Sequence, residues 1–157
     1  MAHYLDSSAV VKYYVTEPGS VWLREAVDAE KAVILSEITT VEVAAALGIL
    51  HRVGRIRLSR RRTFWDRFER DCATKYRLAP VVRDHICFAA QLCGKHPLRA
   101  YDALQLAAAM ELRTPLAEQG VPLVFVSADD ALVAASQSEN LAVENPVWHT
   151  DRDAHNV

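Results

Sequence analysis

The sequence predicts a single α/β domain, a three-layer α/β/α sandwich in which helices lie on both faces of a mainly parallel sheet. Short apolar runs alternate along the chain with longer amphipathic stretches, as expected for strands joined by crossover helices. A length of 157 residues fits one domain, and the sequence contains no internal repeat or linker-like segment. We expect the domain to cover residues 1–149, followed by a polar tail over residues 150–157.

The expected strands are the short apolar runs. Residues 121–126 give the strongest strand signal, because they are apolar, rich in β-branched side chains and followed by Ser127-Ala128-Asp129. Further strands are expected at residues 3–5, 33–35, 81–82 and 141–143, and the signal at 81–82 is weak. In open parallel sheets the binding crevice lies outside the carboxyl ends of the strands, so the residues that follow each strand are candidates for a site.

The expected helices begin at residues that can cap a helix N-terminus. Ser7 or Ser8 can cap the first helix, Ser20 the second, and Thr39 or Thr40 the third. Pro97 separates two helices in the second half of the chain. The first expected helix ends at residue 14, and the next two cover residues 21–29 and 39–54. A long arginine-rich helix is expected to start at residue 59, and three further helices are expected at 84–94, 99–112 and 130–138.

Composition is that of an ordinary globular protein, with 51% hydrophobic and 24% charged residues and a formal net charge of −2. The cysteines, Cys72, Cys87 and Cys93, show no metal-ligand spacing and suit reduced thiols of a cytosolic protein. No signal peptide is visible, and no apolar run approaches the ~18 residues needed to cross a bilayer. We therefore expect a cytoplasmic protein with no membrane partner.

Four acidic residues lie where the predicted crevice would be. Asp6 and Asp129 follow strands, while Glu42 and Asp102 lie near the starts of largely apolar helices. Each could simply cap a helix or interact with its dipole. Four such acids in one parallel α/β chain are a less probable coincidence, because a carboxylate on an apolar helix is costly to bury without a partner.

Clustered carboxylates repel one another and need a cation. Oxygen ligands without matched histidine or cysteine suit Mg²⁺ or Mn²⁺. Such an ion lowers the pKa of a bound water and stabilises charge on a phosphoryl oxygen, which predicts hydrolysis of a phosphodiester. None of the six histidines shows metal-ligand spacing, so we assign none of them a catalytic role.

The ordered motifs of this chain resemble those of PIN-domain proteins. They are Leu5-Asp6-Ser7-Ser8-Ala9-Val10-Val11-Lys12, Thr40-Val41-Glu42-Val43, Arg99-Ala100-Tyr101-Asp102-Ala103-Leu104-Gln105-Leu106-Ala107 and Val126-Ser127-Ala128-Asp129. The length, and Tyr14 followed by Glu17-Pro18-Gly19-Ser20, resemble the VapC toxins of toxin–antitoxin pairs. The resemblance spans about residues 3 to 145, and the set of motifs is more specific than any one of them.

This resemblance implies a Mg²⁺- or Mn²⁺-dependent endoribonuclease that is usually a homodimer and is held inactive by a cognate VapB-like antitoxin. By position, Asp6, Glu42 and Asp102 match the three main metal-binding acids, and Asp129 matches the fourth, more variable one. Ser8 and Ser127 match the hydroxyl residues beside these acids. The neighbouring Asp130 competes for the fourth role, but the Ser-x-Asp spacing favours Asp129.

Basic residues are concentrated between residues 52 and 70. Such a cluster is typical of a surface that binds a phosphate backbone, although a solvated helical face with local ion pairs is the alternative. We interpret it as a candidate RNA-binding surface, with the aromatic residues of the same helix in packing roles. Its candidate RNA-binding members are Arg55, Arg57, Arg60, Arg61 and Arg62.

Three other functions deserve comparison. A haloacid-dehalogenase-type phosphatase also begins with an aspartate after its first strand, but it needs a second aspartate where this chain has Ser8. A receiver-type signalling domain needs a phosphoacceptor aspartate mid-chain, and residues 33–36 offer none. A non-catalytic nucleic-acid- or protein-binding module would use the acids only as helix caps, and it predicts no stabilisation by Mn²⁺.

Overall fold

The computed structural model describes residues 1–29 and 32–155, which form a five-stranded parallel sheet with the order β3-β2-β1-β4-β5. The strands are β1 (Ala2–Leu5), β2 (Ala32–Ser36), β3 (Arg77–Ala79), β4 (Leu123–Val126) and β5 (Ala142–Glu144). Strand β1 is central: β2 and then β3 follow on one side of it, and β4 and then β5 follow on the other side. The strand order therefore reverses between β1 and β4, which confirms the predicted fold class and locates its crevice.

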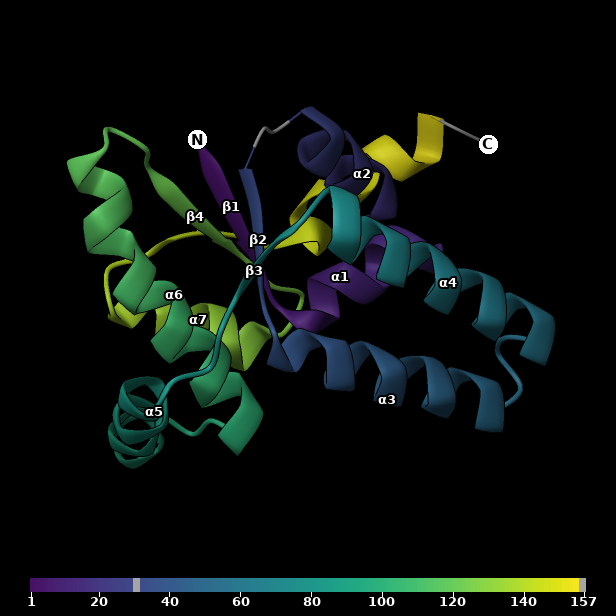
Figure 1. Cartoon of the computed structure of the whole chain (residues 1–157). Coiled ribbons are helices and arrows are strands. Elements are labelled where there is room, and N and C mark those ends of the chain that lie inside the picture. The colour runs from purple at the N-terminus through teal and green to yellow at the C-terminus, as the bar shows by residue number, and fades with distance from the viewer. Residues whose placement is uncertain (30–31, 156–157) are drawn as a thin grey trace.

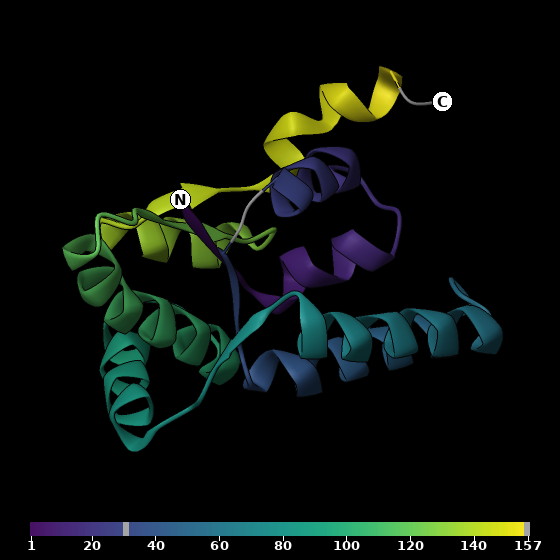
Figure 2. The ribbon, with the colours of Figure 1, turned by 45° about the horizontal axis from the view of Figure 1, so that its top comes forward.

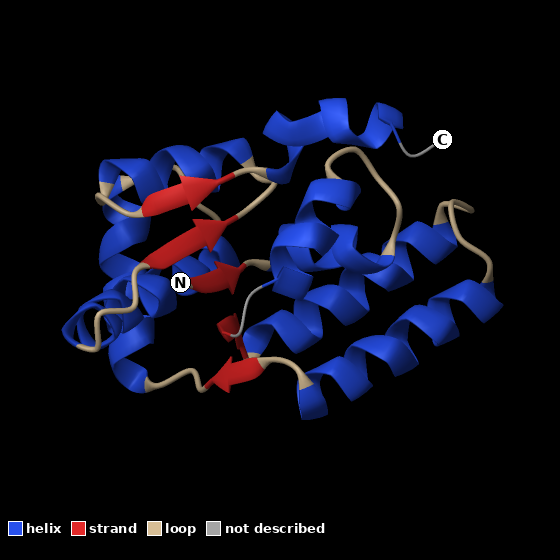
Figure 3. Ribbon diagram, turned by 90° about the horizontal axis from the view of Figure 1, so that it is seen from above, coloured by secondary structure: helices blue, strands red, loops and turns tan. Residues whose placement is uncertain are grey.

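Helices cover both faces of the sheet, as Figure 3 shows from above. One face carries α1 (Ser7–Tyr14), α2 (Ser20–Ala29), α3 (Ile38–Arg52) and α4 (Leu58–Thr74). The other carries α5 (Arg83–Lys95), α6 (Ala100–Glu118) and α7 (Asp130–Ser138). Helices α3 and α4 run side by side and project well beyond the sheet (Figures 1 and 2). None of the described helices is long and apolar enough to span a membrane.

The period-two alternation of the strands separates two hydrophobic cores. Tyr4 and Phe125 stack with ring centroids 5.6 Å apart and face α5, α6 and α7. Leu5 and Val126, the next residues on the same strands, face the core beneath α1 to α4. In register, Tyr4 pairs with Phe125 and Leu5 with Val126, so β1 and β4 end level and present the residues after them at one edge.

The strand expected at residues 81–82 is wrong. The chain instead pairs with β2 at Arg77–Ala79, four residues before the expected start, and Val82 is the N-cap of α5. An edge strand has only one paired side, so it needs little apolar side chain, and Arg77 and Leu78 are exposed. The valine pair therefore carried a misleading strand signal.

Helix α6 is longer than the sequence predicts, because it runs through Pro115 to Glu118. A proline removes one backbone donor and normally favours a helix end. Here Leu112 and Leu116, on either side of the proline, pack against the hydrophobic core, and this packing stabilises the continued helix.

The residues after β5 are also structured. The 3-10 helix η1 covers Pro146–His155, so the described part of the polar tail that we expected from residue 150 is helical. The carboxylate of Asp153 accepts hydrogen bonds from the backbone N–H groups of Gly19 (2.6 Å) and Val21 (3.2 Å), at the N-terminus of α2. The last two residues of the expected tail, 156–157, lie outside the described residues.

A candidate active site of four carboxylates

Four acidic side chains line one cleft of about 590 Å³ at the carboxyl edge of the sheet. Asp6 directly follows β1, and Asp129 follows β4 after a two-residue link. Glu42 lies in the second turn of α3, and Asp102 lies in the first turn of α6. The structure therefore brings together the four acids that the sequence singled out, at the point where the strand order reverses.

Asp6 is almost fully enclosed, with 3% of its surface exposed. Its carboxylate accepts hydrogen bonds from the backbone N–H of Ala9 (3.0 Å), from the hydroxyl of Ser8 (2.8 Å) and from the hydroxyl of Ser127 (3.0 Å). Burial raises the pKa of Asp6 to about 7, the nearby charge of Glu42 adds to the rise, and the hydrogen bonds oppose it. A cation beside this carboxylate would favour its charged form.

The two serines predicted beside the acids orient Asp6 and the turn after β4. Ser8 accepts a hydrogen bond from the backbone N–H of Ala128 (2.8 Å), and Ser127 accepts one from the N–H of Asp129 (3.0 Å). Ser8 occupies the position at which a haloacid-dehalogenase-type phosphatase needs its second aspartate, and it donates to Asp6 instead. The two strand ends are thus tied together through hydroxyl groups.

Glu42 is held from the opposite face of the sheet by Gln105, a residue to which the sequence analysis gave no role. The amide nitrogen of Gln105 donates to Glu42 and to the hydroxyl of Thr39 (2.9 Å), while its oxygen accepts from the hydroxyl of Tyr4 (2.8 Å). Burial raises the pKa of Glu42 and the charge of Asp102 adds to the rise, whereas the Gln105 hydrogen bond opposes it.

Asp102 and Asp129 share one cationic partner, Arg99. Its Nε donates to Asp102 at 3.0 Å, and its terminal nitrogen donates to Asp129 at 3.4 Å. These contacts raise the pKa of Arg99 above its usual value, the Asp102 hydrogen bond being the largest cause. The sequence analysis gave Arg99 no role either. Arg99 and Gln105 lie three residues before and after Asp102, a helical spacing that groups both with Asp102 but does not indicate their partners in other elements.

Asp129, rather than Asp130, faces the cleft. One oxygen of Asp129 accepts the backbone N–H of Leu132 (3.0 Å) and caps α7, and the other faces Arg99. Asp130 is exposed in the first turn of α7 and accepts from the side-chain amide of Asn145 (3.1 Å).

Comparison with known proteins identifies the family. A family model described as "PIN domain" matches residues 3–136, which is most of the chain. The chain belongs to the PIN-domain family. No curated protein sequence matches it significantly. The five-stranded parallel sheet described above is consistent with this family.

Several solved structures have a similar fold, one of them described as a toxin and another as a toxin–antitoxin complex from Klebsiella pneumoniae. FitAcB from Neisseria gonorrhoeae is 18% identical, with a TM-score of 0.62 over 94% of this chain and 99% of that one. VapBC2 from Rickettsia felis, bound to a promoter DNA fragment, is 13% identical, with a TM-score of 0.60 over 92% and 98%. VapC20 from Mycobacterium tuberculosis, a sarcin-ricin loop cleaving toxin, is 15% identical, with a TM-score of 0.60 over 85% and 95%. At these identities the similarity establishes the fold.

The types of side chain in the cleft of this PIN domain suit a hard divalent cation. Carboxylates line the cleft, and its described lining has no imidazole or thiol. In the part of the chain that the structure describes, no three histidine, cysteine, aspartate or glutamate side chains form a ready metal site. Asp102 and Asp129 are engaged by Arg99, and Asp6 by two serines. Binding of a divalent ion would therefore require side chains to move.

The arginine cluster lies away from this cleft. All five candidate RNA-binding arginines are exposed in the α3–α4 turn and the first turns of α4, and none of them lines the acidic cleft. Phe68 of α4 is buried, and Phe64 and Trp65 pack against the same core. These aromatic rings therefore stabilise the α3–α4 pair.

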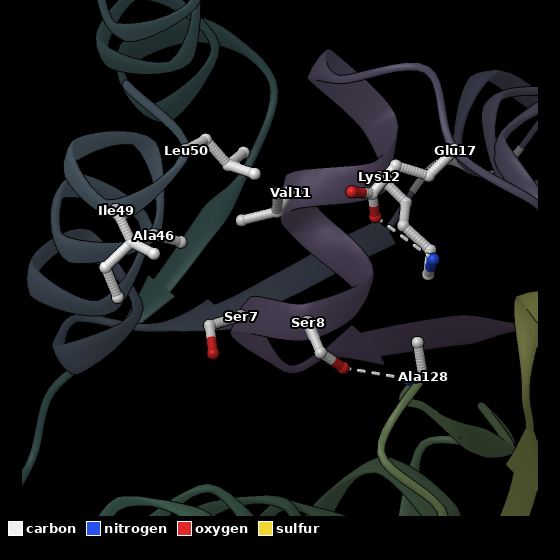
Figure 4. A pocket seen from close by; sticks show the side chains of 9 residues that line it. All are labelled: Ser7, Ser8, Val11, Lys12, Glu17, Ala46, Ile49, Leu50 and Ala128. Carbon is white, nitrogen blue, oxygen red and sulfur yellow. Dashed lines mark hydrogen bonds and ion pairs between the residues drawn. The ribbon is translucent and has the colours of Figure 1, made fainter. Parts of the chain in front are cut away.

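A groove of about 430 Å³ adjoins the acidic cleft (Figure 4). It shares Ser7, Ser8, Ala46 and Ile49 with the cleft and continues between α1 and α3. At the far end of the groove, the carboxylate of Glu17 accepts a hydrogen bond from Lys12 at 3.2 Å and pairs with Arg55 at 3.5 Å. Lys12 and Glu17 line the groove, and Arg55 lies next to this lining. The groove thus leads from the carboxylates toward the first arginine of the cluster.

Proposed function

We propose that this PIN-domain protein is a metal-dependent endoribonuclease and the toxin of a VapBC-type pair. The observation that carries the proposal is the convergence of Asp6, Glu42, Asp102 and Asp129, from four separate elements, on one cleft at the reversal point of the sheet. The carboxylates arise from distant parts of the chain, and the molecule encloses two of them enough to raise their pKa. Because burial and neighbouring acids disfavour the ionised form of these carboxylates, a bound cation would stabilise them.

Asp6, Glu42, Asp102 and Asp129 are the residues that would hold Mg²⁺ or Mn²⁺. When bound, such an ion supplies a water of lowered pKa and stabilises negative charge on a phosphoryl oxygen. The protein contributes orientation: Ser8 and Ser127 fix the carboxylate of Asp6, and Gln105 fixes that of Glu42. Hydrogen-bonded supports of this kind tune the affinity of a metal site.

RNA is the proposed substrate, and the groove of Figure 4 is its proposed path. An RNA strand with its scissile phosphate at the carboxylates could follow the groove past Lys12 toward Arg55 and the exposed arginines of α4. Clustered arginines supply the sequence-independent part of nucleic-acid affinity. A protein with the same fold is described as cleaving the sarcin-ricin loop, which is consistent with this substrate class.

The proposed protein partners are a VapB-like antitoxin and a second copy of this chain. Structures with the same fold include toxin–antitoxin complexes, two of them bound to DNA. Light scattering of the purified protein should give the mass of a dimer, and co-expression with the product of an adjacent small gene should give a stable complex. A monomer at micromolar concentration would contradict the dimer without touching the nuclease proposal.

The nuclease proposal is tested with purified, antitoxin-free protein and total RNA in Mn²⁺, with and without chelator. Asp102→Asn keeps the size and hydrogen-bonding capacity of the side chain but removes a charged ligand, so cleavage should fall by more than about 100-fold. The matched control is Asp84→Asn, because Asp84 is an exposed acid in the first turn of α5, outside the cleft.

Discrete fragments that require the metal and Asp102, but not Asp84, would support the nuclease and its site together. An Asp102→Asn protein that still cleaves RNA in a metal-dependent way would refute the assignment. If folded wild-type protein binds Mn²⁺ and leaves every RNA intact, the metal site stands and the ribonuclease proposal does not.

A further inference from the structure

Arg99 occupies a singular position in the cleft. It precedes α6 as the N-cap residue, yet its side chain caps nothing and reaches back over the carboxylates. One guanidinium joins Asp102 of α6 to Asp129 at the start of α7, two acids that are 27 residues apart in sequence. Its side chain is nevertheless 82% exposed, and these two ion pairs hold it there, with the charge of Glu42 nearby.

Arg99 is also the only basic side chain in the described lining of the acidic cleft. The other charged members of that lining are the four carboxylates, so the single positive charge of Arg99 does not balance the negative charge of the cleft. The exposed arginines of the α3–α4 turn lie outside the cleft and cannot neutralise it at contact distance.

The two contacts of Arg99 are weak enough to be exchanged. Ion pairs of an exposed arginine gain little net free energy, because water screens the charges and the long side chain loses freedom. A divalent cation carries twice the charge in a smaller volume and binds carboxylate oxygens directly. Arg99 and a divalent ion therefore compete for the same carboxylate oxygens, and binding of the ion releases the guanidinium from them.

A released guanidinium keeps its charge at any physiological pH and has a planar pair of donors that matches a phosphate. Arg99 remains tethered to the first residue of α6, so it stays beside the carboxylates after it leaves them. The nearest new anion in a loaded site would be a phosphate of the RNA.

We propose that Arg99 is a built-in counter-cation that holds Asp102 and Asp129 when no divalent ion is bound, competes with that ion, and then binds a phosphate of the substrate. The second half of this proposal rests on the proposed ribonuclease function, and the first half does not. Arg99 thereby sets the affinity of the site for its metal and couples metal occupancy to substrate binding.

Titration calorimetry with Mn²⁺ alone tests the competition. Arg99→Gln removes the competing charge, so the dissociation constant for Mn²⁺ should fall by roughly three- to tenfold. Arg99→Lys keeps one charge but cannot reach both acids with a fork of donors, and it should lie between the two. The control is Arg83→Gln, an exposed arginine that begins α5 outside the cleft, for which we expect no change.

Unchanged or weaker Mn²⁺ binding by Arg99→Gln would overturn the competition, because Arg99 would then be indifferent to the ion or would organise its ligands. Wild-type protein that binds no Mn²⁺ would instead overturn the proposed function itself. The melting temperature in chelator gives a second readout. Arg99→Gln leaves the four carboxylates without a counter-charge in the cleft, so their repulsion should lower its melting temperature but not that of Arg83→Gln.

The phosphate contact is tested by kinetics on a short RNA at saturating Mn²⁺. If Arg99 binds substrate, Arg99→Gln should raise KM and lower kcat/KM by roughly tenfold despite its tighter hold on the metal. An unchanged kcat/KM would refute the phosphate contact. If the wild type cleaves no RNA, this half of the proposal fails with the ribonuclease function, and calorimetry still decides the competition.

Discussion

Two acids of the cleft serve as helix caps and as candidate ligands at the same time. Asp6 accepts the backbone N–H of Ala9 at the start of α1, and Asp129 accepts that of Leu132 at the start of α7. In Asp129 one oxygen caps the helix and the other faces Arg99. Capping and site formation are therefore compatible, because the hydrogen bond to the helix fixes the direction in which the free oxygen points.

Asp6 predicts a pH dependence of stability for the metal-free protein. Its pKa in the folded protein, about 7, lies above the ordinary value of 3.8. A carboxyl group with a raised pKa contributes stability that is fully present below pH ~4 and is lost as the pH rises through ~7. The shift of about 3 units sets an upper bound of roughly 4 kcal/mol on this loss.

We therefore expect Asp6→Asn, which cannot ionise, to flatten the decline in the free energy of unfolding between pH 5 and pH 8 in chelator. Urea denaturation at several pH values measures this, with Asp84→Asn as the control that should follow the wild type. Parallel profiles for Asp6→Asn and the wild type would show that Asp6 ionises without cost. Mn²⁺ should also restore more stability to the wild type at pH 8 than at pH 6.

At the scale of elements, α6 connects the two sides of the sheet. Asp102 and Gln105 lie on the same side of this helix, so the helix that supplies one acid also supplies the hydrogen-bond partner of another acid, Glu42. Gln105 is 1% exposed and contacts Tyr4 of β1, Thr39 and Glu42 of α3. This one amide therefore links α3 to α6 by hydrogen bonds, and with them Glu42 to the helix that carries Asp102.

Replacement of Gln105 by Met keeps the length of the side chain and removes all three hydrogen bonds. We expect the free energy of unfolding to fall by roughly 1–3 kcal/mol, because the hydroxyl of Tyr4 is left buried without its acceptor. Gln137→Met, on the exposed face of α7, is the matched control.

A double-mutant cycle with Tyr4→Phe isolates the contact between the ring hydroxyl and the amide. The removal of the Tyr4 hydroxyl should cost less in the Gln105→Met background than in the wild type, since its acceptor is already gone. Additive effects of the two substitutions would mean that Gln105 and Tyr4 stabilise the fold independently.

The sequence predicts the element order and the cleft that the four acids share, because strands, caps and acids are local signals. The errors are of another kind: β3 is an exposed edge strand that pairing with β2 selects, and α6 continues through Pro115 because Leu116 has a core to contact. Arg99 and Gln105 were missed for the same reason. Their roles depend on partners from other elements, Asp129 and Glu42, which spacing alone does not place beside them.

At the scale of the whole molecule, charge is divided between two regions. The carboxylates gather at the sheet, whereas eight arginines lie between residues 52 and 70, on the projecting α3–α4 pair. Helix α3 has 15 residues and is therefore about 22 Å long, which separates its acidic start from its basic end. A strand of RNA that spans this distance could meet the arginines first and the carboxylates second, so affinity and cleavage would depend on different ends of the same helix pair.

This division predicts that the arginines of the turn affect RNA affinity and its salt dependence, and do not affect metal binding. In the Asp102→Asn background, which we expect to leave RNA intact, Arg60→Gln combined with Arg61→Gln should weaken binding of a single-stranded RNA several-fold at 100 mM KCl. If both residues contact phosphates, the slope of log affinity against log salt should shrink by about 1.4. Fluorescence anisotropy from 50 to 200 mM KCl measures both quantities.

The control pair for this measurement is Arg77→Gln with Arg83→Gln, two exposed arginines of β3 and α5 that remove the same net charge from another part of the surface. Equal losses in both pairs would mean that RNA responds to net charge alone, and the arginine cluster would then be an ordinary solvated helix face. A loss confined to Arg60 and Arg61, with unchanged Mn²⁺ affinity, would establish the α3–α4 pair as the surface that delivers RNA to the cleft.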